Sequence, residues 1–302
     1  MALTAPECVW PLQAVLGEGP VWWQGALWFT DIKRRKIHRF DPAGPTHSWD
    51  APSEVGFLAP FRDGHFLAGA KTGLYDFDPA AGSFALIRTV EPDQPGNRLN
   101  DGAVDAKGRL WFGSMDDDER APTGKLYRLD AGGLAAMDSG TVITNGPAFS
   151  PDGGTLYHTD TLGKTIYAFD TGEDGALRNK RVFVTIEDGA GFPDGPVVDA
   201  QGCLWTGLFG GWAVRRYAPD GALLETVSFP VANVTKLAFG GSDLTTVYAT
   251  TASKGVDAAA LAKQPLAGGL FRFTADTPGL PQNSIAFAFR AERPSYPAKG
   301  SA

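Results

Sequence analysis

The chain has 302 residues, of which 43% are hydrophobic and 20% charged, with a formal net charge of −7. This composition is that of a folded globular protein, and the acidic balance argues against a nucleic-acid partner, because phosphate binding requires a basic surface. With two cysteines, no apolar stretch of about 18 residues and no signal-peptide pattern, we expect a cytoplasmic protein without a disulfide framework or a membrane partner.

One pattern recurs six times along the chain. It consists of a short apolar strand, a turn containing glycine, a strand with a central aromatic residue and a third strand. The copies cover residues 19–44, 57–82, 102–133, 146–175, 195–221 and 236–276. Helical patterns are nearly absent, and the best candidate is the short segment 257–266. The sequence therefore predicts an all-β chain built from repeats.

The spacing of the central aromatic residues indicates the kind of repeat. These residues are Trp28, Phe66, Trp111, Tyr157, Trp205 and Tyr248. Subtraction of neighbouring numbers gives spacings of 38, 45, 46, 48 and 43 residues, as in four-stranded propeller blades. Segments 85–92, 181–186 and 223–230 fit the outermost strands of their blades.

We therefore expect a six-bladed β-propeller with four-stranded antiparallel blades around a central channel, forming a single domain over residues 1–302. The blades begin near residues 18, 56, 100, 145, 194 and 234, and the N-terminal segment completes the last blade.

Aligning the copies exposes a polar position just before the first strand. Its occupants are Glu18, Gly56, Asp101, Asn145, Asp194 and Thr235. The first strand of each blade lines the channel of a propeller, so these residues should converge near the axis at one end.

Three of the six positions carry oxygen ligands in similar settings: Glu18 in E-G-P, Asn145 in N-G-P and Asp194 in D-G-P. Asn or Asp before Gly is a common turn residue, which is the plain structural explanation, but Glu is not a preferred turn former. Two carboxylates near an axis repel one another unless a proton or a cation intervenes. Two carboxylates and an amide oxygen suit a divalent cation, with positions left for water and substrate.

The motifs LGEGPVW, NRLNDGAVDAKGRLWFGSM, TNGPAFSPDGGTLYHTDT and DGPVVDAQGCLW resemble the regucalcin (senescence marker protein)/gluconolactonase family of six-bladed propellers. The stretches DIKRRKIHRFDP and HTDTLGKTIYAFD resemble bacterial sugar-acid lactonases of the xylonolactonase or arabinonolactonase type. The resemblance implies one divalent metal ion on Glu18, Asn145 and Asp194, and hydrolysis of a sugar (aldono-) lactone.

The resemblance also assigns substrate contacts. In NRLND, Arg98 and Asn100 match positions that contact the sugar oxygens, whereas Asp101 matches a position that supports the metal ligands from behind. A further carboxylate should lie in MDDDER, where Asp118 is the best positional match.

Lactone hydrolysis requires a polarised carbonyl, an activated water and stabilisation of the leaving ring oxygen. We expect the metal to act as a Lewis acid and Asp194 to be the general base that acts on the attacking water. The alternative is that the metal lowers the pKa of this water and Asp194 relays the proton. The sequence leaves the lactone open, and the ion could be calcium, zinc, manganese, magnesium or ferrous iron.

Two other functions would use the same fold. A non-catalytic calcium- or metal-binding propeller would need the ligands but not Arg98 and Asn100. A hydrolase of other esters or of phosphotriesters would favour aromatic channel walls. Because Arg98 and Asn100 suit a polyol, we expect a sugar lactonase, and a closed ring of blades favours a monomer.

Overall fold

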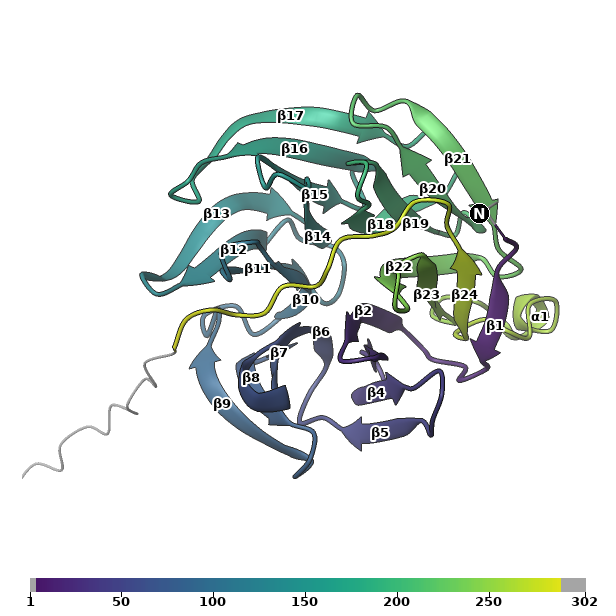
Figure 1. Cartoon of the computed structure of the whole chain (residues 1–302), viewed down its shortest axis with the longest axis horizontal. Coiled ribbons are helices and arrows are strands. Elements are labelled where there is room, and N and C mark those ends of the chain that lie inside the picture. The colour runs from purple at the N-terminus through teal and green to yellow at the C-terminus, as the bar shows by residue number, and fades with distance from the viewer. Residues whose placement is uncertain (1–3, 289–302) are drawn as a thin grey trace, which may run out of the picture.

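The computed structural model describes residues 4–288. Its strands form six four-stranded sheets that surround a central channel as blades (Figure 1). Strands paired within a sheet are antiparallel throughout the described residues, as in the pairs β2·β3, β10·β11 and β18·β19. The predicted six-bladed β-propeller is confirmed.

Each blade contributes one strand to each of four concentric layers. The innermost strands are β2 (Gly17–Trp23), β6 (Val55–Pro60), β10 (Asn97–Val104), β14 (Thr144–Phe149), β18 (Phe192–Val198) and β22 (Asn233–Gly240). The second strands are β3 (Ala26–Asp31), β7 (Phe66–Ala70), β11 (Leu110–Asp116), β15 (Thr155–Asp160), β19 (Leu204–Phe209) and β23 (Thr246–Ala252). The third strands are β4 (Lys36–Phe40), β8 (Gly73–Asp78), β12 (Gly124–Asp130), β16 (Thr165–Thr171), β20 (Ala213–Tyr217) and β24 (Leu270–Thr274). The outermost strands are β5 (His47–Asp50), β9 (Ser83–Thr89), β13 (Gly133–Thr141), β17 (Leu177–Thr185), β21 (Leu223–Ser228) and β1 (Glu7–Trp10).

The ring closes within the last blade, because β1 pairs with β24. Glu7 lies opposite Arg272, and Arg272 Nη2 contacts Glu7 Oε2 at 3.2 Å. Both ends of the repeat array therefore belong to one sheet, which ties the first and last blades together.

The six predicted central aromatic residues are buried in the second strands, where they pack against neighbouring blades. Trp28 lies 4.6 Å from Phe66 between the centroids of their rings, across the interface of the first two blades. Tyr248 of the last blade stacks on Trp22 of the first at 5.5 Å. Burial of these large side chains between blades supplies much of the apolar stabilisation of the ring.

In two blades, the turn between the first and second strands contains a buried aspartate that accepts a hydrogen bond from the central tryptophan. Asp199 is fully buried, and its Oδ2 accepts hydrogen bonds from Trp205 Nε1 and Arg216 Nε, both at 2.9 Å. Asp105 Oδ2 accepts in the same way from Trp111 Nε1 at 2.8 Å. The D-x-x-G-x-x-W pattern thus fixes the turn between the first two strands to the interior of the blade.

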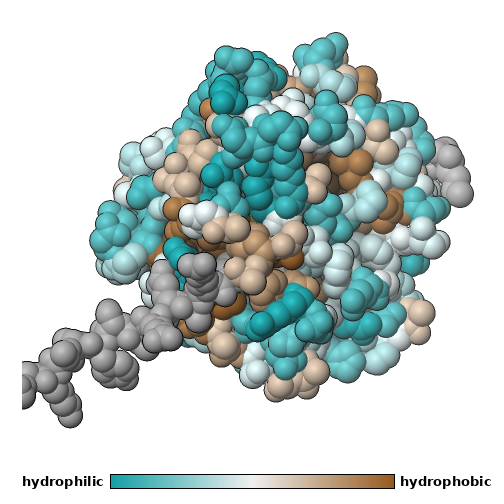
Figure 2. All heavy atoms as spheres, turned by 60° about the vertical axis from the view of Figure 1, so that its left-hand side comes forward, coloured by the Kyte–Doolittle hydropathy of each residue, from teal (hydrophilic) through white to brown (hydrophobic). Residues whose placement is uncertain are grey.

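The segment after β24 crosses one end of the channel (Figure 1). Gly279 N donates to Leu244 O at 2.8 Å, Asn283 Nδ2 to Val104 O at 3.1 Å and Ile285 N to Pro60 O at 2.9 Å. This segment, residues 276–288, is called the strap below. Figure 2 shows a largely hydrophilic surface with apolar residues grouped beside the end of the described chain, where Phe61, Leu86, Ile87, Ile285 and Phe287 line a groove.

Helical structure in residues 4–288 consists of α1 (Ala258–Leu261) and a 3-10 turn at Arg62–Gly64. Helix α1 lies in the predicted segment and begins after Asp257, whose Oδ1 accepts from Ala260 N at 2.8 Å. Within the described residues, neither helix has the length and apolar character needed to cross a membrane.

Replacing Asp199 by Ala should lower the free energy of unfolding by about 3 kcal/mol, because the buried Trp205 N–H and Cys203 N–H lose their acceptor and Arg216 keeps only its pairing with Glu225 as an ionic contact. Urea unfolding followed by tryptophan fluorescence measures this loss. The control is Asp220→Ala, because exposed Asp220 accepts only a turn N–H from Ala222, and its loss should stay below about 1 kcal/mol. Equal losses in the two variants would contradict the proposed role of the buried aspartate.

Candidate active site

Each innermost strand is interrupted by a shift in pairing register at the equivalent position. The shifts fall between Glu18 and Val21, Val55 and Phe57, Leu99 and Gly102, Asn145 and Ala148, Pro193 and Pro196, and Val234 and Leu237. A β-bulge re-aims the side chains beside it and is common next to active sites. The bulges are what turn the polar residues of the repeat toward the channel.

The register also corrects the expected placement of these residues. Glu18 and Asn145 lie inside their strands, paired with Thr30 and Thr159, rather than before them. The innermost strands are already paired for about two residues before the bulge, and this early pairing is not visible in the repeat alignment.

One cavity of about 210 Å³ lies at this end of the channel. Five of the predicted site residues line it: Glu18, Arg98, Asn100, Asn145 and Asp194. The volume is below the roughly 300–1,000 Å³ of typical pockets for drug-sized ligands, so the cavity suits a small molecule.

Glu18 and Asp194 are buried carboxylates that face this cavity. Glu18 Oε2 accepts from Gly19 N and Asp194 Oδ1 accepts from Gly195 N, both at 3.0 Å. Within residues 4–288, no hydrogen bond occupies the second oxygen of either carboxylate. Each side chain thus keeps one oxygen for a ligand.

Burial, followed by the nearby charge of Asp101, raises the pKa of Glu18 to about 7, against the opposing effects of the Gly19 N–H and the charges of Lys236 and Arg98. Burial, followed by the charges of Glu18 and Asp101, raises the pKa of Asp194 well above its usual value. Two carboxylates with raised pKa values in one cavity favour either a shared proton or a bound cation.

A chain of hydrogen bonds orients the polar side chains along the cavity wall. Arg98 Nη1 donates to Asn100 Oδ1 at 2.5 Å, and Asn100 Nδ2 donates to Asn145 Oδ1 at 3.0 Å. Asn145 Nδ2 in turn donates to Thr161 Oγ1 at 2.9 Å. Because an amide oxygen has two lone pairs, Asn145 Oδ1 retains one for a ligand.

These donors fit a divalent cation. Two carboxylate oxygens and an amide oxygen form the all-oxygen set that hard and borderline divalent ions prefer, and such an ion would offset the repulsion between Glu18 and Asp194. In residues 4–288 no group of three or more His, Cys, Asp or Glu side chains has a metal-binding arrangement. The set described here reaches three ligands only through the amide of Asn145.

Asp117 anchors Arg98 from behind. It accepts hydrogen bonds from Arg98 Nε at 2.8 Å, Lys33 Nζ at 2.6 Å and Lys71 Nζ at 2.9 Å. Burial raises the pKa of Asp117, but the hydrogen bonds from Lys33 and Lys71 and the charge of Arg98 outweigh burial and hold it well below its usual range. The guanidinium group of Arg98 is therefore fixed before a ligand arrives.

The acidic run after Met115 contains the predicted contact Asp118 and its neighbour Glu119. Asp118 does not line the cavity: its side chain is 74% exposed and lies 3.7 Å from Arg120. Glu119 lines the cavity instead and forms an ion pair with Lys254, which also lines it. Glu119 has a positive φ of 61°, and this turn in the backbone decides which of the four neighbouring acids faces the cavity.

The sequence analysis did not identify the apolar wall of the cavity. The residues of this wall are Leu16, Met115, Ile143, Leu162, Phe192 and Phe209. A signal for half of them was present, since Leu16, Ile143 and Phe192 each precede a polar ring residue by two positions. The cavity therefore combines a polar floor with an apolar rim.

The fold and site define a class: a six-bladed propeller with two buried carboxylates and an amide at one end of its channel. Residues 16–253 match the family described as SMP-30/Gluconolactonase/LRE-like region, and the chain belongs to this family.

The chain is 34% identical over 278 residues to the 6-deoxy-6-sulfogluconolactonase of Pseudomonas putida, covering 90% of this chain and 96% of that one. It is 36% identical over 266 residues to the L-arabinolactonase of Azospirillum brasilense, covering 85% and 87%. Among solved structures, a calcium-binding protein, regucalcin, from Agrobacterium tumefaciens superposes with a TM-score of 0.90 at 29% identity, covering 94% and 98%.

The raised pKa values predict how the free energy of unfolding depends on pH when a chelator has removed divalent ions. An unfolded Glu18 loses its proton near pH 4.5 and the folded one near pH 7, so folded molecules hold more protons over this interval. The free energy of unfolding should therefore fall between about pH 4.5 and pH 7, by up to roughly 3 kcal/mol for Glu18. Urea unfolding at several pH values measures the slope. Glu18→Gln should flatten it, and an equally steep profile in this variant would contradict the assignment.

Proposed function

We propose that this protein is a metal-dependent sugar lactonase that hydrolyses an aldonolactone to the aldonic acid. The observation that carries the proposal is the convergence of Glu18, Asn145 and Asp194 with Arg98 and Asn100 on one small cavity. The names of the lactonase relatives support the reaction class. We further propose that it acts as a monomer in the cytoplasm, in carbohydrate metabolism.

Glu18, Asn145 and Asp194 would hold the divalent cation. A cation bound there supplies Lewis-acid polarisation of the lactone carbonyl. The regucalcin neighbour, whose description calls it calcium-binding, supports calcium as one candidate among the divalent ions.

Arg98 and Asn100 orient the sugar. Arg98 is already fixed by Asp117 and Asn100, so its remaining N–H groups can donate to substrate hydroxyl oxygens without further ordering of the side chain. The apolar rim accepts the C–H faces of the ring. This combination supports a small cyclic polyol ester over a larger apolar ester.

Asp194 is the proposed general base. A water oxygen attacks the lactone carbonyl carbon while the Asp194 carboxylate accepts its proton. The bond between the carbonyl carbon and the ring oxygen then breaks, and the ring oxygen takes up a proton to become the hydroxyl of the open acid.

The second candidate is a non-catalytic metal-binding propeller, which the description of the regucalcin neighbour favours. This alternative needs the cation ligands but assigns no task to the pre-ordered Arg98 or to the cavity.

The first test is acid release from a panel of pentono- and hexonolactones by chelated enzyme refilled with one divalent ion at a time. We expect ion-dependent turnover, with a loss on the order of 10²–10⁴-fold in kcat/KM for Asp194→Asn. Tight ion binding without turnover above spontaneous ring opening would leave the metal-binding propeller.

A matched pair of variants tests the charged residue Glu119 of the cavity wall. Glu119→Gln removes a charge that lines the cavity beside Lys254, so KM should rise about 3- to 10-fold. Asp118→Asn changes an exposed neighbour and should leave kcat and KM within about twofold of the parent. A larger change of KM in Asp118→Asn than in Glu119→Gln would favour Asp118 as the residue that contacts the substrate.

A further inference from the structure

In each innermost strand, one residue follows the polar position that aligns with Glu18. In four blades this following residue is glycine, and in the other two it is a large residue. The occupants are Gly19, Phe57, Gly102, Gly146, Gly195 and Lys236. The Phe57 ring packs over Gly102 and the Lys236 stem packs over Gly195, where any side chain would collide with them.

The packing of Lys236 against Gly195 shows how closely these residues fit together. A Cβ atom at Gly195 would lie 2.6 Å from Lys236 Cδ and 2.7 Å from Cγ. Glycine beside Asp194 is thus required by the lysine stem, which crosses the channel from β22. The Lys236 side chain is 9% exposed.

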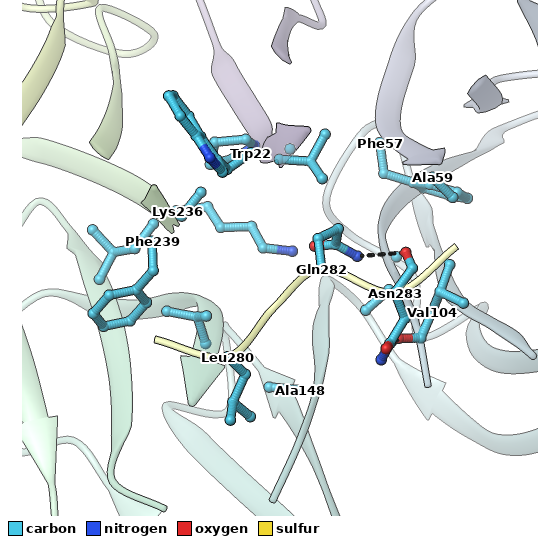
Figure 3. A pocket seen from close by; sticks show the side chains of 18 of the residues that line it. Trp22, Phe57, Ala59, Val104, Ala148, Lys236, Phe239, Leu280, Gln282 and Asn283 are labelled. Carbon is cyan, nitrogen blue, oxygen red and sulfur yellow. Dashed lines mark hydrogen bonds between the residues drawn. The ribbon is translucent and has the colours of Figure 1, made fainter. Parts of the chain in front are cut away.

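Lys236 lines a second cavity of about 140 Å³, which lies further along the innermost strands and is also lined by strap residues Leu280–Asn283. Figure 3 shows the lysine entering this space among apolar neighbours such as Trp22, Phe57 and Phe239. Of the described residues that line it, Lys236 alone carries a charge. An ammonium group in such surroundings requires a charged partner.

The partner is Asp101, which is 1% exposed and forms an ion pair with Lys236 through Oδ1. Asp101 Oδ1 also accepts from Gly102 N at 2.7 Å, and Oδ2 accepts from Gly146 N at 2.8 Å. Both oxygens are thereby engaged by the protein. Although Asp101 occupies the same repeat position as Glu18 and Asp194, it does not line the substrate cavity.

We propose that Lys236 is a positioning residue whose ammonium group acts as a built-in counter-charge, holding Asp101 out of the cation site and leaving Glu18 and Asp194 as the only carboxylates that coordinate the ion. The inference rests on the proposed function for the existence of the cation site. It adds the charge balance: two carboxylates match one divalent ion, whereas a third uncompensated carboxylate would favour a trivalent ion.

The first experiment compares Lys236→Met, Asp101→Asn and the double variant by thermal unfolding in chelator. Each single variant leaves one buried charge without its partner and should lower Tm by roughly 5–10 °C. The double variant removes both charges and should recover most of that loss. Lys36→Met, which removes an exposed ion pair with Asp50, is the control and should change Tm by less than about 2 °C.

The second experiment measures the affinity of the same proteins for Ca²⁺ by calorimetry and for Tb³⁺ by luminescence. Lys236→Met should raise the ratio of Tb³⁺ to Ca²⁺ affinity at least about tenfold, because Asp101 becomes available to the ion. Asp101→Asn leaves the ammonium uncompensated and should weaken Ca²⁺ binding at least about tenfold. The double variant should resemble the parent in both respects.

The outcomes separate the two proposals. Additive losses of Tm in the double variant, or an unchanged ion preference in Lys236→Met when the parent binds Ca²⁺, would overturn the role of Lys236 alone. A parent protein that binds neither ion would overturn the cation site and this inference together. If Lys236→Met does not fold, the Ca²⁺ affinities of Asp101→Asn and the parent decide the matter, and equal affinities would overturn the inference.

Discussion

Glu18, Asp101 and Asp194 are held in one buried layer of the channel, where little water is present to screen the repulsion between them. The rest of the site follows from how this repulsion is relieved. Lys236 compensates Asp101 from within the protein. Glu18 and Asp194 remain, each with one oxygen toward the cavity, and their need for a proton or a cation makes this end of the channel chemically active.

The ring of blades makes this arrangement possible. Six twisted sheets can close only if their innermost strands face each other across a narrow channel, which brings residues far apart in the sequence within reach of one another. A bulge follows the polar position in the innermost strands, and Gly102 and Gly195, which come after it in their blades, leave space for Phe57 and Lys236. The strap crosses the other end of the channel (Figure 1), so the two ends of one set of strands carry different environments.

Much of this was readable in the sequence because a propeller repeats its local pattern. The buried aromatic residue of each second strand recurs at blade spacing, and Trp28 and Trp205 occupy equivalent places although they are distant in the chain. The polar ring position follows from the same alignment. Part of the apolar rim could have been identified too, since Leu16 and Phe192 each precede a residue of the polar ring by two positions.

The sequence by itself therefore determined the fold, the number of blades and which residues meet at the axis, because these depend on periodicity alone. Only the tertiary structure decided what each of them faces. Glu119 rather than Asp118 lines the cavity because of the path of a turn, and Asp101 is withdrawn from it because Lys236, 135 residues away in the chain, supplies the opposite charge. Loop paths and contacts between blades depend on how the whole ring packs, which no local pattern encodes.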